Sequence, residues 1–177
     1  PPRAMRSRGD AEAARHPERV SHLILWCSWA QGSDYLESPR GQAFRALRAT
    51  DWELYTESVA HAVVGWSNTE HAHTTAEFIR ECVTQETAQA AITALAKHDV
   101  SRLLSQLKCP ALVMHRRNSA YPELSVARRL ASQIPGARLA ILDGASMFPE
   151  FGDIDAALRV VDEFLGEGEA GAAAPVS

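Results

Sequence analysis

Cysteine is scarce in this sequence, and no two cysteines stand close together. Cys27, Cys82 and Cys109 are spread along 177 residues without a C-x-x-C pair. An odd number of widely spaced cysteines argues against a disulfide framework and a zinc knuckle. We expect buried or half-buried thiols, because an unbridged cysteine packs like a small apolar side chain. Cys27 follows a predicted strand, but no paired base is identifiable, so a reactive thiol is not expected there.

Long apolar runs and a strong excess of charge are also missing. No apolar run approaches the roughly 18 residues that a membrane-spanning helix needs. The basic N-terminus is not followed by the apolar stretch of a secretory signal. The formal net charge of -4 gives no reason to expect nucleic acid or a membrane as a partner. These absences predict a cytoplasmic protein, and the initial proline predicts a fragment or a processed product.

The sequence does contain enough apolar residues for one folded domain. Its apolar fraction of 46% and charged fraction of 23% are ordinary for a globular protein. Short apolar runs bounded by turn signals predict strands at 20–26, 109–115 and 137–143. Helical spacing predicts helices at 122–134 and 152–167. Strands and helices that alternate in this way indicate an α/β protein with a parallel sheet of about three strands.

The stretch between the first and second predicted strands has a different character. From Pro39 to about Leu107, glycine nearly disappears and alanine is abundant. Apolar residues recur at helical spacing after Asp51, a typical N-cap residue, and a further helix is predicted at 86–97. Residues 31–38 are expected to form a loop. An all-helical insertion therefore interrupts the α/β pattern.

Three segments, taken in order, resemble one known family: "AARHPERVSHLIL", "DVSRLLSQLKCPALVMHRR" and "ARRLASQIPGARLAILDGASMFPEFGD". They are similar to the end of the elbow helix with the next strand, the return from the cap, and the final helix, strand and loop of α/β-hydrolases. The subgroup resembles the hydrolase modules found alone or fused to adenylate-cyclase or LuxR-type regulators in bacteria. The resemblance implies a partial α/β-hydrolase core at 1–30 and 108–167, a helical cap insertion at 31–107 and a disordered tail at 168–177.

The resemblance also implies a serine nucleophile in a G-x-S-x-G turn. That turn should lie about a dozen residues before His16, between a strand and a helix. The chain reads "PPRAMRSRGD" there, and Ser7 lacks the glycines that permit the tight turn. The nucleophile elbow is therefore absent from this chain.

The acid and the base that the resemblance implies are also replaced. Asn118 and Ser119 stand where the subgroup has acidic residues, and neither carries the negative charge that stabilises an imidazolium. The base should lie three residues after Gly144, where the chain has Met147, whose thioether cannot take and return a proton. With Ser119 and Met147 as degenerate positions, we expect no hydrolysis through this triad.

Two other groups could carry chemistry. His71 and His73 form an H-x-H pair that would bind metal in a strand, but at a helix start the two side chains diverge and are expected to be solvated. His115 ends a predicted strand and is followed by two arginines, Arg116 and Arg117, which could bind a phosphate or a carboxylate. Contacts with the scaffold are the expected role of this segment. No metal or cofactor is predicted.

A ligand pocket could lie between the sheet and the cap. Aromatic residues at helical spacing are usually core, but they could also line such a pocket for a small apolar ligand. The candidates are Trp26, Trp29, Trp52, Tyr55, Trp66, Met147 and Phe148.

Three interpretations remain open. The chain is a truncated or decayed hydrolase-like protein without catalysis, a non-catalytic binding or sensor module that uses the cap pocket, or part of an ester or amide hydrolase completed by further N-terminal sequence. In each case an unpaired edge of the sheet predicts association with a second copy or with a partner chain.

Overall fold

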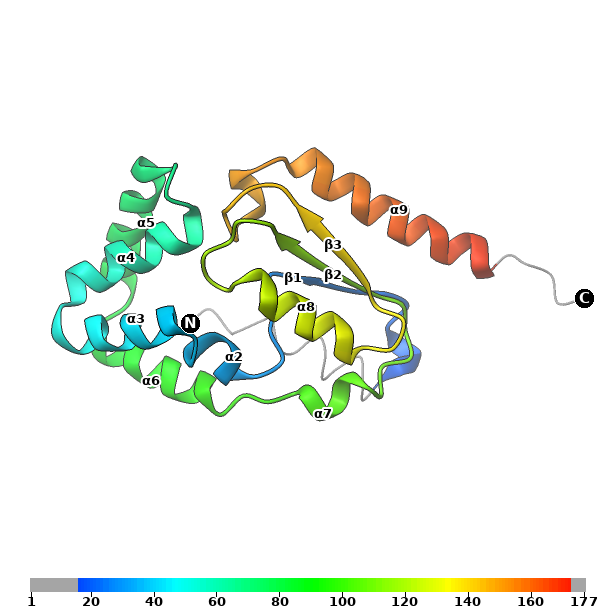
Figure 1. Ribbon diagram of the computed structural model, residues 1–177, viewed down its shortest axis with the longest axis horizontal. Helices are drawn as coiled ribbons and strands as arrows, with labels where there is room; N and C mark the ends of the chain where they lie inside the picture. Colours follow the sequence, from blue (N-terminus) through cyan, green and yellow to red (C-terminus); the bar gives the residue numbers. More distant parts are fainter. Residues whose placement is uncertain (1–15, 173–177) are drawn as a thin grey trace, which may run out of the picture.

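A computed structural model describes residues 16–172 of the chain (Figure 1). Ser7 and the expected elbow segment lie outside these residues. The described part begins with a short 3-10 helix, η1 (Pro17–Arg19), and the first strand, β1 (Leu23–Trp26). The other strands are β2 (Ala111–Arg116) and β3 (Arg138–Leu142). They form one parallel sheet in the order β1-β2-β3, which confirms the predicted fold class.

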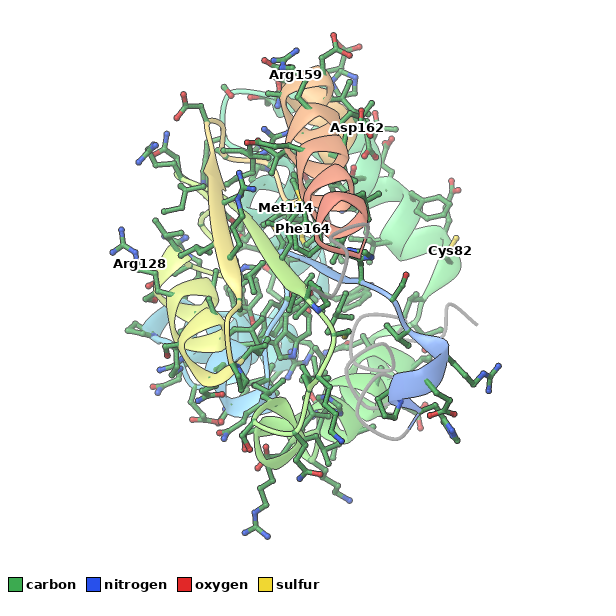
Figure 2. All side chains as sticks on the ribbon, turned by 90° about the vertical axis from the view of Figure 1, so that its right-hand side faces the viewer. Cys82, Met114, Arg128, Arg159, Asp162 and Phe164 are labelled. Carbon is green, nitrogen blue, oxygen red and sulfur yellow. The ribbon has the colours of Figure 1, made fainter. Side chains whose placement is uncertain are left out.

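The central strand β2 is buried along its whole length because helices cover both faces of the sheet. Figure 1 shows α8 (Leu124–Gln133) on one face and α9 (Ile154–Ala172) on the other. Val113 packs toward Leu130 of α8, whereas Met114 packs toward Phe164 of α9. Figure 2 shows Phe164 beside Met114. This alternation is the period-two pattern of a strand between two apolar layers.

Strand β1 is not buried on both faces. Leu23 and Leu25 are buried, but Ile24 between them is 38% exposed. Among the described residues β1 pairs with β2 alone, so it is an edge strand of the sheet. An edge position leaves one side of the strand without the neighbour that would cover it.

The insertion between β1 and β2 is helical, as predicted. It contains α2 (Gly32–Leu36), α3 (Pro39–Thr50), α4 (Trp52–Val64), α5 (Thr69–Cys82), α6 (Gln85–Ala96) and α7 (Ser101–Leu104). Its two ends meet in an antiparallel bridge between Gln31 and Asp99. Helices α3 to α6 lie beyond the carboxyl ends of the strands (Figure 1).

Capping explains where several of these helices begin. Asp51 accepts a hydrogen bond from the backbone N–H of Leu54, and Thr84 accepts one from Thr87, so each satisfies an otherwise unpaired donor. The expectation of a loop at 31–38 is wrong for Gly32–Leu36. There Gln31 and Asp34 form a reciprocal capping box that stabilises a helix too short to show periodicity.

The end of the chain also differs from the expectation. The helix α9 continues to Ala172, into the segment 168–177 that was expected to be a disordered tail. Residues 173–177 lie outside the described part. No helix in residues 16–172 is long and apolar enough to cross a membrane.

Candidate functional site

The loop after β3 is fixed to the helical insertion and to β1. The backbone N–H of Met147 donates to the carbonyl of Val63 at 2.8 Å, and the Ser146 hydroxyl donates to the same carbonyl at 3.2 Å. The indole Nε1 of Trp26 donates to the Met147 carbonyl at 2.7 Å. Since the carboxyl ends of parallel strands meet at one edge, these bonds place Met147 where such folds gather functional residues.

Met147 itself is buried in an apolar cluster. Its exposed fraction is 8%, and it belongs to the same cluster as Tyr55, Val63 and Tyr121. A thioether in such surroundings packs well and neither accepts nor donates a proton. The side chain at the expected base position therefore serves packing.

Ser119 lies on the neighbouring loop, after β2. The two loops are joined where the backbone N–H of Asn118 donates to the carbonyl of Gly144 at 3.0 Å. Ser119 is 7% exposed, and its hydroxyl has no hydrogen-bond partner among the described residues. The Asn118 side chain is exposed. The structure thus brings the loops of Ser119 and Met147 together, without a carboxylate or an imidazole at either position.

His115 is a fully buried histidine close to this edge of the sheet. Its Nδ1 lies 2.8 Å from the carbonyl of Arg116, and its Nε2 has no partner in the described residues. Burial lowers the pKa of the imidazole, and the contact with the Arg116 carbonyl partly offsets this. Among the described residues, no hydroxyl or thiol is hydrogen-bonded to the ring.

Arg116 holds the loop after β3 in place. It is 1% exposed, and its guanidinium donates to the carbonyls of Asp143 at 2.8 Å and Pro149 at 3.3 Å. The guanidinium carbon also lies 5.2 Å from the centre of the Trp26 ring, a cation–π distance. Among these candidates, Arg116 therefore has the scaffold role that the sequence indicated. Arg117 is exposed and pairs with Asp143 at 3.0 Å.

Two glycines make room for this arginine. A Cβ on Gly152 would lie 2.5 Å from Nη2 of Arg116, which is closer than real Cβ contacts. Gly144 has a φ of 116°, a conformation that side chains disfavour, and a Cβ there would lie 3.4 Å from Cδ of Arg116. Gly144 is therefore favoured by its backbone conformation, and Gly152 by the packing of the Arg116 side chain.

Most of the predicted pocket residues pack against one another or against the same cluster. Trp29 stacks on Tyr35 with ring centres 4.6 Å apart, and Tyr35 stacks on Tyr121 at 3.8 Å. Further along, Trp52 stacks on Tyr55 at 5.3 Å. Phe44 connects these two aromatic stacks, with its ring centre 5.1 Å from that of Tyr121 and 6.3 Å from that of Tyr55. The rings fill much of the space between the sheet edge and the insertion.

Trp66 does not join this set. Gly65, with a φ of 106°, ends α4 and turns the chain, so Trp66 is 64% exposed and lies near His61. The sequence analysis missed Tyr35, Phe44 and Tyr121. Only the tertiary fold shows that Phe44 contacts residues from both α4 and the loop after β2.

A small pocket lies between α5 and the 3-10 helix η2 (Pro149–Phe151). Its volume is about 350 Å³, and it is lined by Thr74, Thr75, Phe78, Phe148, Glu150 and Phe151. Phe148 is the predicted pocket residue that borders it. Phe78 is 63% exposed, so one wall of the pocket presents an aromatic side chain to solvent.

The remaining candidates are separated. His71 packs against Phe151 with ring centres 4.9 Å apart, while His73 contacts Glu57 at 3.0 Å. Within residues 16–172, no group of three histidine, cysteine or acidic side chains is placed to hold a metal ion. Cys27 is buried and Cys109 is partly buried, but Cys82 at the end of α5 is exposed, contrary to the expectation.

Comparisons with known proteins agree with this architecture. No family model matches the chain. A Caulobacter sp. (strain K31) protein that carries the name carbamate hydrolase RutD is 25% identical over 138 residues, which is 75% of this chain and 52% of that protein. The chain thus spans about half the length of this relative.

Solved structures give the same result for the fold. A hydrolase from Oleispira antarctica matches with a TM-score of 0.70 and 16% identity over 88% of this chain and 60% of its own. The enol-lactonase from Burkholderia xenovorans LB400 matches with a TM-score of 0.67 and 22% identity over 89% of this chain and 61% of its own. Est816, described as an N-acyl homoserine lactone degrading enzyme, has a TM-score of 0.72 at 18% identity, covering 88% and 62%.

The chain has a partial α/β-hydrolase fold, which matches about 60% of the length of these solved structures.

Proposed function

We propose that this chain is a non-catalytic protein with the α/β-hydrolase fold, with residues 31–107 as its cap. The observation that carries the proposal is the burial of Met147 at the position of the base, on a loop fixed by Trp26 and Val63. A nucleophile of this class needs a base that takes its proton and an acid that orients the base. Met147 and Ser119 supply neither function.

Further sequence would not by itself restore the chemistry. The chain spans 52% of its sequence relative and about 60% of the solved structures, so a completed ester or amide hydrolase is an alternative. A serine supplied from elsewhere would still face Met147 and Ser119. The same reasoning predicts that Met147→His alone does not restore activity, because the imidazolium would lack a carboxylate partner.

Ester hydrolysis tests the proposal. The chain, Met147→His and the double variant Met147→His/Ser119→Asp are each incubated with p-nitrophenyl acetate and p-nitrophenyl butyrate. Equal rates in buffer and with each protein are the expected result. Saturable turnover by the unmodified chain, removed by one substitution in the site, would show that the proposal is wrong.

A second candidate function is the binding of a small apolar ligand as a sensor module. The pocket between α5 and η2 favours it, because three phenylalanines line about 350 Å³ of space beside the loop of Met147. The similarity to modules fused to regulators is consistent with such a role.

A thermal-shift measurement with neutral probes tests this second candidate. Ethyl butyrate and toluene should raise the melting temperature of the chain, because they bind the folded state only. Phe78→Ala should abolish the increase, whereas Leu54→Ala, at a residue that is 50% exposed on α4 and does not line the pocket, should leave it unchanged. Unchanged melting temperatures with both probes would contradict the candidate.

A further inference from the structure

A second pocket lies where α3 ends and α6 begins. It has a volume of about 440 Å³ and is lined by Arg48, Ala49, Gln85, Glu86 and Gln89. The Gln85 side-chain amide donates to the backbone carbonyl of Arg48 at 2.6 Å, which ties the two helices together at the pocket. None of the predicted site residues borders it.

Arg48 is the unusual member of this pocket. Although it borders the pocket, only 3% of the residue is exposed. Its Nε donates to Oε1 of Gln89 at 2.9 Å, and its guanidinium carbon lies 5.5 Å from the centre of the Tyr55 ring. No carboxylate within residues 16–172 forms an ion pair with it, and its two terminal nitrogens make no hydrogen bond there.

A buried guanidinium without a paired carboxylate provides one half of an anion-binding site. Taking a cation out of water is costly unless an anion or a full set of acceptors compensates. Here the ring of Tyr55 and one amide oxygen fix the orientation of the Arg48 side chain, and the paired terminal N–H groups remain available in the geometry that binds two oxygens of one anion.

The surrounding charges select the kind of anion. Glu86 borders the pocket and is exposed, so its carboxylate opposes a ligand of high negative charge. The first turn of α6 contributes a partial positive charge, since its leading N–H groups have no acceptors within the helix. Ala49 and the glutamine methylenes add apolar wall. We propose that this pocket binds a small organic monocarboxylate, whose carboxylate pairs with Arg48 and whose short apolar body lies against the wall.

Titration of the full chain with sodium butyrate tests the site by two-dimensional amide NMR at constant ionic strength. We expect saturable shifts at Ala49, Gln85 and Gln89, with a Kd of about 1–10 mM for one charge-assisted contact. n-Butanol, the neutral analogue, should not shift these resonances, and inorganic phosphate should bind more weakly because of Glu86. Equal effects of butyrate and n-butanol, or tighter binding of phosphate, would overturn the proposal.

Two kinds of variant identify the residues involved. Arg48→Met should abolish binding. Arg48→Lys should weaken it, because lysine lacks the paired terminal N–H groups that bind two oxygens of one carboxylate. Glu86→Gln keeps the exposed surface and should tighten butyrate binding roughly two- to fivefold by removing a repulsive charge. Glu70→Gln, in the equivalent first turn of α5, is the matched control and should change nothing. Should Arg48→Met fail to fold, the Glu86→Gln result decides: an unchanged Kd would refute the site.

Discussion

The indole N–H of Trp26 at the end of β1 donates a hydrogen bond to the backbone carbonyl of Met147, at 2.7 Å and across 121 positions of the sequence. This bond joins the edge strand of the sheet to the loop that replaces the expected base. It shows that the loop is held in place by a specific contact.

Trp26→Phe removes this hydrogen bond and keeps an aromatic ring beside Arg116. The free energy of unfolding should fall by about 1–3 kcal/mol, because a partly buried carbonyl loses its donor. Urea denaturation followed by circular dichroism measures the change. Trp66→Phe is the control; its side chain is 64% exposed, so the effect should stay within about 0.5 kcal/mol. Equal effects of both substitutions would contradict the role of the bond.

Gly152→Ala should disturb the packing of Arg116. The new Cβ would lie 2.5 Å from Nη2, so the guanidinium must move away from the carbonyls that it binds. We expect a loss of about 1–3 kcal/mol in the free energy of unfolding. Gly166→Ala is the matched control within α9: nothing lies within 4 Å of its Cβ, and alanine should stabilise the helix by up to about 1 kcal/mol. A neutral Gly152→Ala variant would show that Arg116 is not constrained there.

The pH dependence of stability should contain a contribution from His115. Burial lowers its pKa below 6.5, so at mildly acidic pH the unfolded chain binds a proton that the folded chain resists. Stability from this residue should therefore fall as the pH drops from 6.5 toward the lower folded value, by at most about 1.4 kcal/mol per pH unit. Urea denaturation of the chain and of His115→Gln across this range measures it. Parallel pH curves for the two proteins would contradict the assignment.

The edge of β1 should promote association. Leu23 and Cys27 direct their N–H groups to β2, so the alternate residues Ile24 and Trp26 direct theirs to the other side, where no described strand pairs with them. We propose that a second copy or a partner chain covers this edge. Light scattering should give a mass above the 19.3 kDa monomer, and Ile24→Lys should lower it. A monodisperse monomer that melts cooperatively would contradict this.

The sequence predicted the layers of the fold better than the boundaries of its elements. The strands at 109–115 and 137–143 were found at Ala111–Arg116 and Arg138–Leu142, because a run of apolar residues between turn signals is a local feature. The helix Gly32–Leu36 was not predicted, since five residues are too few to show a helical period.

The candidate site was predictable only in part. The prediction that Met147 stands at the position of the base rests on its spacing from Gly144, which the sequence shows directly. The position of Trp66 was not predictable, since the turn at Gly65 removes it from the face of α4. The environment of Arg48 depends in part on Gln89 of α6, which is 41 positions away in the sequence, so no local pattern indicates that this arginine is buried without a carboxylate.

We propose that this chain activates no nucleophile, and covalent labelling tests this proposal most directly. A fluorophosphonate probe reacts with a serine only when a base activates the hydroxyl. After incubation with the probe, the intact mass of the chain should be unchanged, and an intact serine hydrolase in the same experiment should gain one adduct. A stoichiometric adduct on this chain that maps to a single serine would contradict the proposed function.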